Sequence, residues 1–139
     1  MIVLDTNVLS ALMRPERNQA VVAWADRQSA AQLWTTSVCL MEVRLGLLLM
    51  PEGRRRADLE QGFARLLAGQ LRDRVLPLDE DAAEAASRVA AIQQRRGINA
   101  EFGDYQIAGI AMARRAILAT RNVRDFQDLD IPLVDPWTA

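Results

Sequence analysis

The chain opens with the stretch Met1-Ile2-Val3-Leu4-Asp5-Thr6-Asn7, in which four apolar residues are followed directly by an acid, a hydroxyl and an amide. A short apolar run bounded by polar residues is typical of a buried strand in a parallel sheet. In open α/β sheets, functional residues gather just beyond the carboxyl ends of the strands. We therefore predict that Asp5 is a site residue on which other polar side chains converge.

Short apolar runs alternate with amphipathic helical segments along the rest of the sequence. Strands are expected at 1–4, 32–36, 75–78, 117–120 and 131–134, and helices at 7–13, 18–28, from 37 onward, from the Arg-rich stretch to 71, 79–97, 104–115 and 123–127. We expect Asn18, Ser37 and Asp79 to cap their helices, and Pro77 favours an edge position for its strand. This alternation predicts one α/β domain over residues 1–139, with a parallel sheet and helices on both of its faces.

The composition excludes several classes of protein. No apolar run approaches the roughly 20 residues that span a bilayer, and the N-terminus lacks the features of a signal peptide. A single cysteine, Cys39, excludes an internal disulfide framework and fits a reducing compartment. We therefore expect a cytoplasmic protein with no membrane contact.

The sequence contains no histidine, which removes Ser-His-Asp and Cys-His nucleophile systems and histidine metal ligands. An enzyme of this composition would depend on carboxylates around a hard cation such as Mg²⁺ or Mn²⁺. All 17 basic residues are arginines. Either a GC-rich genome or a need to bind phosphate explains this preference. Because the net charge is −1, any contact with nucleic acid requires a local patch of positive charge.

Two acids fall on apolar helix faces. Glu42 is spaced with Val38 and Leu45 along a predicted apolar row that also contains Met41, Leu48 and Leu49. Asp104 precedes Ile107, Ala108 and Ala111 at core-facing spacing. A carboxylate directed at a core is costly unless it is paired, hydrogen-bonded or bound to metal. An arginine partner for Glu42, and helix caps for Asp5 and Asp104, are the structural alternatives.

A fourth acid follows the strand that ends at Thr120. The loop Arg121-Asn122-Val123-Arg124-Asp125 should open on the same sheet edge as Asp5, so Asn122 and Asp125 can both reach inward. Several carboxylates in one pocket repel each other, and a divalent cation resolves that conflict. The same arrangement suits hydrolysis of a phosphodiester.

These motifs, taken in order, resemble a PIN domain, most closely the VapC- and FitB-type toxins of type II toxin–antitoxin systems. The resemblance is carried by the opening Asp5-Thr6-Asn7, by Ser37 with Glu42, by Asp104-Tyr105-Gln106-Ile107-Ala108, and by Leu118-Ala119-Thr120-Arg121-Asn122 before Asp125-Phe126. It implies a three-layer α/β/α sandwich with a mainly parallel sheet. It also implies a Mg²⁺- or Mn²⁺-dependent endoribonuclease, often a homodimer, that a small antitoxin protein neutralises.

Family roles transfer onto Asp5, Glu42 and Asp104 as catalytic and metal-binding acids. Asp125 is expected to complete the set, with Asn122 as the alternative. Thr6 and Thr120 match supporting hydroxyl positions.

We expect Arg121 and Arg124 to flank the mouth of the site and to hold RNA phosphates, or else to be solvated loop charges. The stretch Arg54-Arg55-Arg56 is either a solvated helix start or an RNA clamp. An antitoxin helix could bind in a groove between the apolar stretch 45–50 and the Arg-rich helix after it. The alternative is that the apolar stretch belongs to the core and that the Arg-rich helix presents an ordinary solvated face.

Two other functions remain open from the sequence. A non-catalytic PIN-like module would keep the pocket but act through protein contacts. A different phosphoryl-transfer enzyme would generally need an acid at position 7, which is Asn7, and a lysine, which is absent.

Overall fold

A computed structural model describes all 139 residues and contains one five-stranded sheet. The strands are β1 (Ile2–Leu4), β2 (Leu33–Thr36), β3 (Val75–Leu76), β4 (Ile117–Ala119) and β5 (Leu133–Val134). Their order is β3-β2-β1-β4-β5, and every neighbouring pair is parallel. The opening stretch therefore forms the central strand, and the strand before Pro77 lies at an edge, as predicted.

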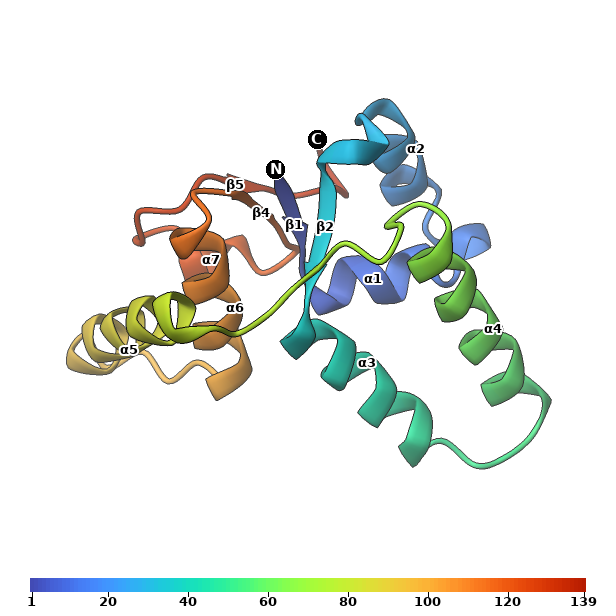
Figure 1. The fold of residues 1–139 in the computed structure, drawn as a ribbon, viewed down its shortest axis with the longest axis horizontal. Coiled ribbons are helices and arrows are strands. Elements are labelled where there is room, and N and C mark those ends of the chain that lie inside the picture. The colour runs from blue at the N-terminus through green and yellow to red at the C-terminus, as the bar shows by residue number, and fades with distance from the viewer.

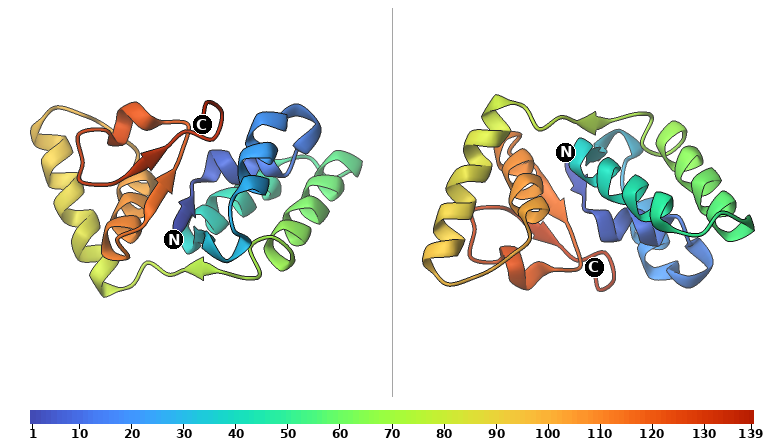
Figure 2. Two further views of the ribbon diagram at one scale, coloured as in Figure 1. Left: turned by 90° about the horizontal axis from the view of Figure 1, so that it is seen from above. Right: turned by 90° about the horizontal axis from the view of Figure 1, so that it is seen from below.

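Seven helices and two short 3₁₀ turns connect the strands. The helices are α1 (Thr6–Leu12), α2 (Gln19–Arg27), α3 (Ser37–Leu49), α4 (Arg54–Ala68), α5 (Glu80–Arg95), α6 (Phe102–Ala113) and α7 (Val123–Phe126), and the turns are η1 (Pro15–Arg17) and η2 (Ala30–Gln32). Helices α5 and α6 lie on one side of the strands and α1 to α4 on the other (Figures 1 and 2). The predicted α/β/α arrangement is confirmed.

The core is built on the central strand and on α6. Val3 and Leu4 of β1 are fully buried, and they belong to a cluster of 29 buried apolar residues. Helix α6 is apolar on nearly all sides, which is typical of a helix enclosed by other elements. None of the helices combines the length and the apolar character required to cross a bilayer.

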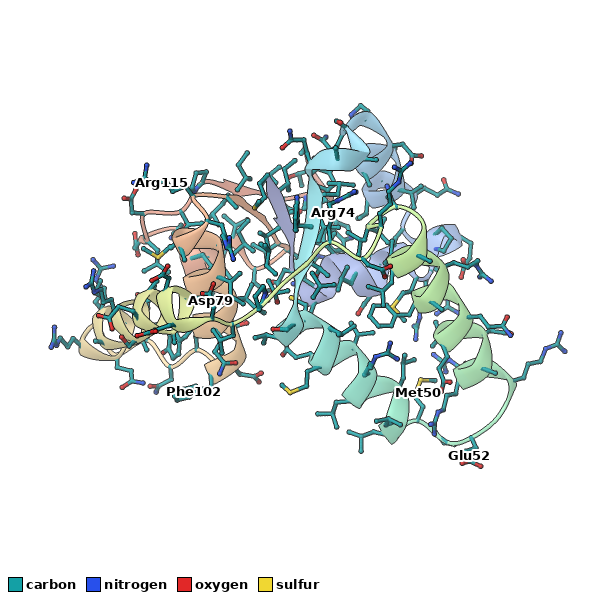
Figure 3. The ribbon with its side chains drawn as sticks, viewed as in Figure 1. Met50, Glu52, Arg74, Asp79, Phe102 and Arg115 are labelled. Carbon is teal, nitrogen blue, oxygen red and sulfur yellow. The ribbon has the colours of Figure 1, made fainter.

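Arg74 holds the edge of the sheet in place. Its guanidinium donates to the carbonyl oxygens of Leu33 and Gln70, at 2.9 and 2.8 Å, and to that of Ala30 (Figure 3). These bonds join the segment that leads into β3 to the start of β2. The two-residue strand β3 is therefore stabilised by a side chain as well as by its ladder.

The predicted apolar row of α3 is wrong. Of its members only Val38 is buried, whereas Met41, Leu45, Leu48 and Leu49 are between 52 % and 76 % exposed. The buried residues of the helix are Val38, Cys39, Val43 and Leu47. Since the helix is apolar at almost every position, its periodicity could not indicate which face would pack.

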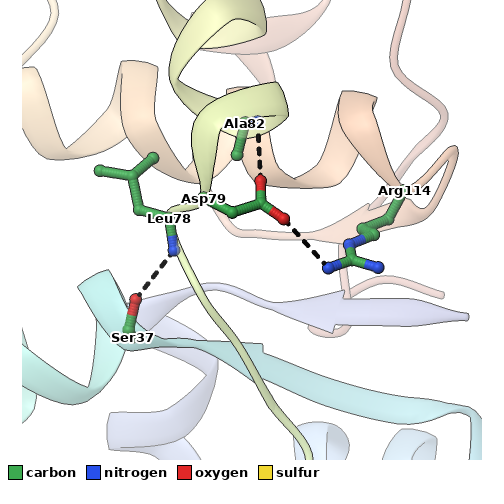
Figure 4. Close-up of polar contacts among 5 residues, drawn as sticks. All are labelled: Ser37, Leu78, Asp79, Ala82 and Arg114. Carbon is green, nitrogen blue, oxygen red and sulfur yellow. Dashed lines mark hydrogen bonds and ion pairs between the residues drawn. The ribbon is translucent and has the colours of Figure 1, made fainter.

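The predicted cap of α3 is also wrong, whereas Asn18 is the N-cap residue of α2 as predicted but forms no side-chain capping bond. The N-cap of α3 is Thr36, whose hydroxyl accepts a hydrogen bond from the Cys39 amide at 3.0 Å. The hydroxyl of Ser37 instead accepts one from the Leu78 amide (Figure 4). Asn18 precedes α2, but its side chain donates to the carbonyl oxygen of Arg14.

Asp79 caps α5 as predicted. Its Oδ1 accepts from the Ala82 amide at 2.9 Å, and its Oδ2 lies 3.3 Å from the guanidinium of Arg114 (Figure 4). This second contact joins the start of α5 to the end of α6. Helix α6 begins at Phe102, so Asp104 lies in its first turn and is not its cap.

Helices α5 and α6 pack closely because Gly109 has no side chain. A Cβ at this position would lie 2.6 Å from both the Ala82 carbonyl oxygen and the Ala86 Cβ. We predict that Gly109→Ala lowers the free energy of unfolding by about 1–3 kcal/mol or more, since the backbone of α5 must move. The urea midpoint measures the change.

Gly46→Ala in α3 is the matched control, because a Cβ there meets nothing within 4 Å. It should stabilise the protein by a few tenths to about 1 kcal/mol. Equal midpoints for the two variants would contradict the packing argument.

Candidate active site

Asp5 and Thr120 meet where two central strands end. Leu4 pairs with Ala119 in the β1–β4 ladder, so the residue after each strand lies at the same edge. The Thr120 hydroxyl donates to Asp5 Oδ2 at 2.7 Å, and the Thr6 amide donates to Asp5 Oδ1 at 2.8 Å. Asp5 is only 3 % exposed. Its carboxylate therefore has a fixed orientation, and it also caps α1.

Glu42 is held beside Asp5 by the next residue of the chain. The Thr6 hydroxyl donates to Glu42 Oε1 at 2.7 Å, which joins α1 to α3. On its other side, a Cβ at Gly103 would lie 3.2 Å from Glu42 Oε2, so the first turn of α6 passes close to the carboxylate. Glu42 is half-buried and forms no ion pair, so the predicted alternative of an arginine partner is wrong.

A cavity of about 480 Å³ collects the acids at this edge, and we call it the acidic pocket. It is lined by Asp5, Thr6, Asn7, Glu42, Ile98, Asn99, Ala100, Glu101, Asp104, Asn122 and Asp125. The structure thus brings the four predicted acids together from the end of β1 and from α3, α6 and α7. No basic side chain lines this cavity.

Two carboxyl groups of the acidic pocket, those of Asp104 and Asp5, have raised pKa values. The pKa of Asp104 is raised to about 6, first by burial and then by the negative charges of Asp5, Asp125, Glu42 and Glu101. Burial also raises the pKa of Asp5, against the hydrogen bonds from Thr120 and Thr6 that favour its charged form. The negative charge of the pocket is therefore not fully compensated by the positive charges and hydrogen-bond donors around it.

Cys39 lies behind this site and stays a thiol. Burial and the charge of Asp5 raise the pKa of its side chain to about 11. A neutral, fully buried thiol is a packing residue and not a nucleophile.

The loop after β4 is held by hydrogen bonds. The Asn122 amide donates to the Thr120 hydroxyl at 3.0 Å, and the side chain of Gln93 on α5 donates to the Asp125 carbonyl oxygen at 3.0 Å. Asn122 and Asp125 both line the acidic pocket and are solvent-exposed. The geometry keeps both as candidates for the fourth position.

The two predicted RNA-binding arginines lie outside the acidic pocket. The guanidinium of Arg121 is 4.8 Å from the centre of the Trp137 ring, and both residues line a neighbouring cavity of about 540 Å³, here called the central cavity. Arg124 is exposed and lines neither cavity. Because the neighbouring Asn122 and Asp125 do line the acidic pocket, a place for the two arginines at its mouth stays a prediction.

Sequence reasoning missed five residues that line the acidic pocket, and two of them act on its acids: Asn7 and Glu101, beside Ile98, Asn99 and Ala100. Asn7 donates to Asp5 Oδ2 at 3.4 Å, and its own oxygen accepts from the Arg121 amide at 3.3 Å. Glu101 lines the pocket from the residue before α6 and adds to its negative charge. Its position three residues before Asp104, on the same helix face, is the signal that could have found it.

The chemistry of the acidic pocket fits a hard divalent cation. All of its charged groups are carboxylates, and a cation would relieve the repulsion that raises the pKa of Asp104. No three acid or cysteine side chains surround a single point closely enough to hold an ion by themselves. Mg²⁺ commonly binds through one or two carboxylates together with water and substrate phosphates, so the pocket fits that mode.

Comparison with known proteins gives four consistent similarities: one family profile, two relatives and one solved structure. The profile of the PIN domain matches residues 2–132. The chain is 35 % identical to the VapC ribonuclease Y4jK of Sinorhizobium fredii, over 99 % of this chain and 98 % of that protein. It is 33 % identical to the toxin FitB of Neisseria gonorrhoeae, over 99 % of each. The crystal structure of FitAcB from Neisseria gonorrhoeae superposes with a TM-score of 0.88 at 29 % identity, over the full length of both chains.

The raised pKa of Asp104 predicts a pH-dependent stability in the absence of divalent cations. Since the folded protein binds this proton more tightly than the unfolded chain does, the contribution of Asp104 to stability falls as pH rises from about 4 to about 6. We predict that Asp104→Asn raises the melting temperature in EDTA at pH 7 and flattens its dependence on pH.

Asp130→Asn, at an exposed position outside the acidic pocket, is the control that removes one charge. A melting temperature of Asp104→Asn at or below that of the wild type at pH 7 would show that the carboxylates do not repel each other as inferred.

Proposed function

The chain belongs to the PIN-domain family, and we propose that it is an endoribonuclease toxin held inactive by a small cognate antitoxin. The relatives named VapC ribonuclease and toxin FitB, which match nearly the whole chain, support this function. The observation that carries the proposal is the acidic pocket, in which Asp5, Glu42, Asp104 and Asp125 converge from four elements.

We assign Mg²⁺ or Mn²⁺ to the acidic pocket. Asp5 and Asp104 would hold the ion, with Glu42 and Asp125 completing its surroundings and Asn122 as the alternative to Asp125. When bound, a divalent cation supplies Lewis-acid activation of a water molecule and of the phosphodiester. The carboxylate-only lining supports this choice, because both ions prefer oxygen ligands.

The residues of the chain perform the remaining tasks. Thr120 and Thr6 keep Asp5 in one orientation, so its free lone pairs face the pocket at no cost of reorganisation. Because Glu42 Oε1 already accepts from Thr6, its Oε2 is the atom available to accept a proton from the attacking water. Asn7 links the site to the loop at Arg121 and so positions the loop that carries Asn122 and Asp125.

The exposed row of α3 supports a protein partner. Met41, Leu45, Leu48 and Leu49 leave a large apolar surface in water, which marks interaction sites in soluble proteins. We propose that an antitoxin helix covers this row, and that the toxin also forms a homodimer. An RNA substrate and a single free thiol together support a cytoplasmic location.

The test is RNA cleavage by purified protein freed of any partner, with Mg²⁺, with Mn²⁺ or with EDTA. We predict metal-dependent cleavage that is abolished by EDTA and reduced at least about 100-fold by Asp5→Asn, because that variant removes a charge at the centre of the site. Asp130→Asn should cut at the wild-type rate.

Undiminished cleavage in EDTA would refute the metal assignment. If the protein cuts no RNA and calorimetry detects no bound Mn²⁺, the chain is a non-catalytic PIN-like binding module.

The roles of Arg121 and Arg124 are tested separately. If each contacts an RNA phosphate, Arg121→Ala and Arg124→Ala weaken binding and lower the slope of log K against log salt by about 0.7 each. Fluorescence anisotropy with single-stranded RNA over a salt series measures both effects. Unchanged affinity and slope for both variants would exclude a substrate role for these arginines.

A further inference from the structure

We propose that a third cavity, which shares no lining residue with the acidic pocket, is a phosphate-binding subsite that anchors the strand of the RNA substrate. This cavity of about 640 Å³ lies between η1 and the start of α4, and it is lined by Arg14, Arg17, Arg54, Arg55 and Arg65. We call it the arginine cavity. The inference rests on the proposed function, because it assigns part of the substrate's contact surface.

The cationic groups of the arginine cavity have no partners within the chain. The three ion pairs of the protein are Arg56–Glu60, Arg88–Glu84 and Arg114–Asp79, and none involves these five arginines. None of the five guanidinium groups donates a hydrogen bond either. Glu16 and Asp58 are the only acids in the lining, so the cavity is locally positive in a protein of net charge −1.

The start of α4 is unfavourable for a helix unless an anion binds there. Positive side chains near a helix N-terminus oppose the macrodipole, and acids are normally preferred. Helix α4 begins with Arg54, Arg55 and Arg56, has no acid in its first turn, and is capped by Gly53 without a side-chain hydrogen bond. A phosphate would pair with the guanidinium groups and with the positive end of the helix at once.

A continuous lining connects the arginine cavity with the acidic pocket. The acidic pocket shares Thr6, Asn7 and Glu42 with the central cavity, and the central cavity shares Met13, Arg14 and Leu59 with the arginine cavity. This path follows α1, whose residues line the central cavity together with residues of α3 and with Leu59 of α4; Figure 1 shows these three helices on one side of the sheet. The seven residues of α1 extend about 10 Å along this path.

The central cavity can receive bases between the two charged ends. Its lining contains the Trp137 ring with Arg121 stacked on it, together with apolar side chains from α1 and α3. Aromatic rings and guanidinium planes are surfaces on which unpaired bases stack without regard to sequence.

The charge distribution favours RNA over an acidic peptide as the occupant. The acidic pocket has no basic residue in its lining, so the charge that attracts a polyanion must come from a neighbouring surface. The arginine cavity supplies that charge on the same connected path. Arginine also pairs bidentately with phosphate.

The test compares Arg54→Gln/Arg55→Gln with Arg88→Gln/Arg95→Gln, which removes the same charge from α5 on the far side of the molecule (Figure 1). The probe is a fluorescein-labelled 20-nucleotide single-stranded RNA in EDTA, followed by anisotropy over a salt series. The α4 variant should weaken binding at least tenfold and lower the salt slope by about 1.4, twice 0.7. The α5 control should stay within twofold. Equal effects of the two variants would overturn the proposal.

Steady-state cleavage gives an independent readout. Because Arg54 and Arg55 lie away from the acids, the α4 variant should raise KM for the 20-nucleotide RNA and leave kcat unchanged. If wild-type protein cuts no RNA yet the α4 variant loses RNA binding, the nuclease assignment fails and the phosphate subsite stands. If cleavage is normal and RNA binding is unchanged in the variant, the subsite fails and the nuclease stands.

Two further measurements separate the loss of a phosphate site from unfolding and from the loss of a peptide site. A melting temperature within about 2 °C of the wild type shows that the α4 variant is folded, and Arg17→Gln/Arg65→Gln repeats the test from other elements. A 20-residue polyglutamate peptide distinguishes the occupants. If peptide binding depends on Arg54 and Arg55 and RNA binding does not, the cavity is a protein-docking site and the proposal is overturned.

Discussion

The burial of the Asp5 carboxylate at the end of the central strand is the constraint on which the site depends. A carboxylate that is 3 % exposed is stable only with hydrogen-bond donors around it, and Thr120 and Thr6 provide two. The register between β1 and β4 brings Thr120 to this position, so the sheet itself determines the orientation of Asp5. Thr6 then extends the arrangement to Glu42, and α1 begins at the same point.

Two regions of this chain are electrostatically unfavourable when empty, and their charges are opposite. Five acids line the acidic pocket, and five arginines without ion-pair partners line the arginine cavity. Clusters of like charges without partners are expected at the binding sites of a protein, where a ligand of opposite charge compensates them. In the proposed function a divalent cation would relieve the first and phosphate groups the second, so an RNA strand with its cation would satisfy both ends of one path.

The sequence predicted the parts of the structure that local rules control. The end of an apolar strand identified Asp5, the proline after β3 identified the edge strand, and Asp79 was recognised as a cap. Prediction from the sequence failed where local rules rank two alternatives equally and tertiary contacts decide between them. Thr36 and Ser37 are both good caps, and only the contact of Ser37 with Leu78 distinguishes them. Similarly, Arg121 could be placed on its loop, but its stacking on Trp137 depends on a residue of the C-terminal segment.

The rotation of helix α3 about its own axis explains why its apolar row is exposed and not buried. Cys39, Val43 and Leu47 face the core at i, i+4 and i+8, and this rotation directs Glu42 at the hydroxyl of Thr6. Turning the helix to bury Leu45 and Leu49 would break the contact of Glu42 with the Thr6 hydroxyl. The same rotation of the helix therefore places Glu42 in the acidic pocket and leaves the row exposed. Polar residues along the row would leave Glu42 in the same place, so the acid site does not require apolar residues there. The proposed antitoxin helix, which would cover the row, accounts for their apolar character.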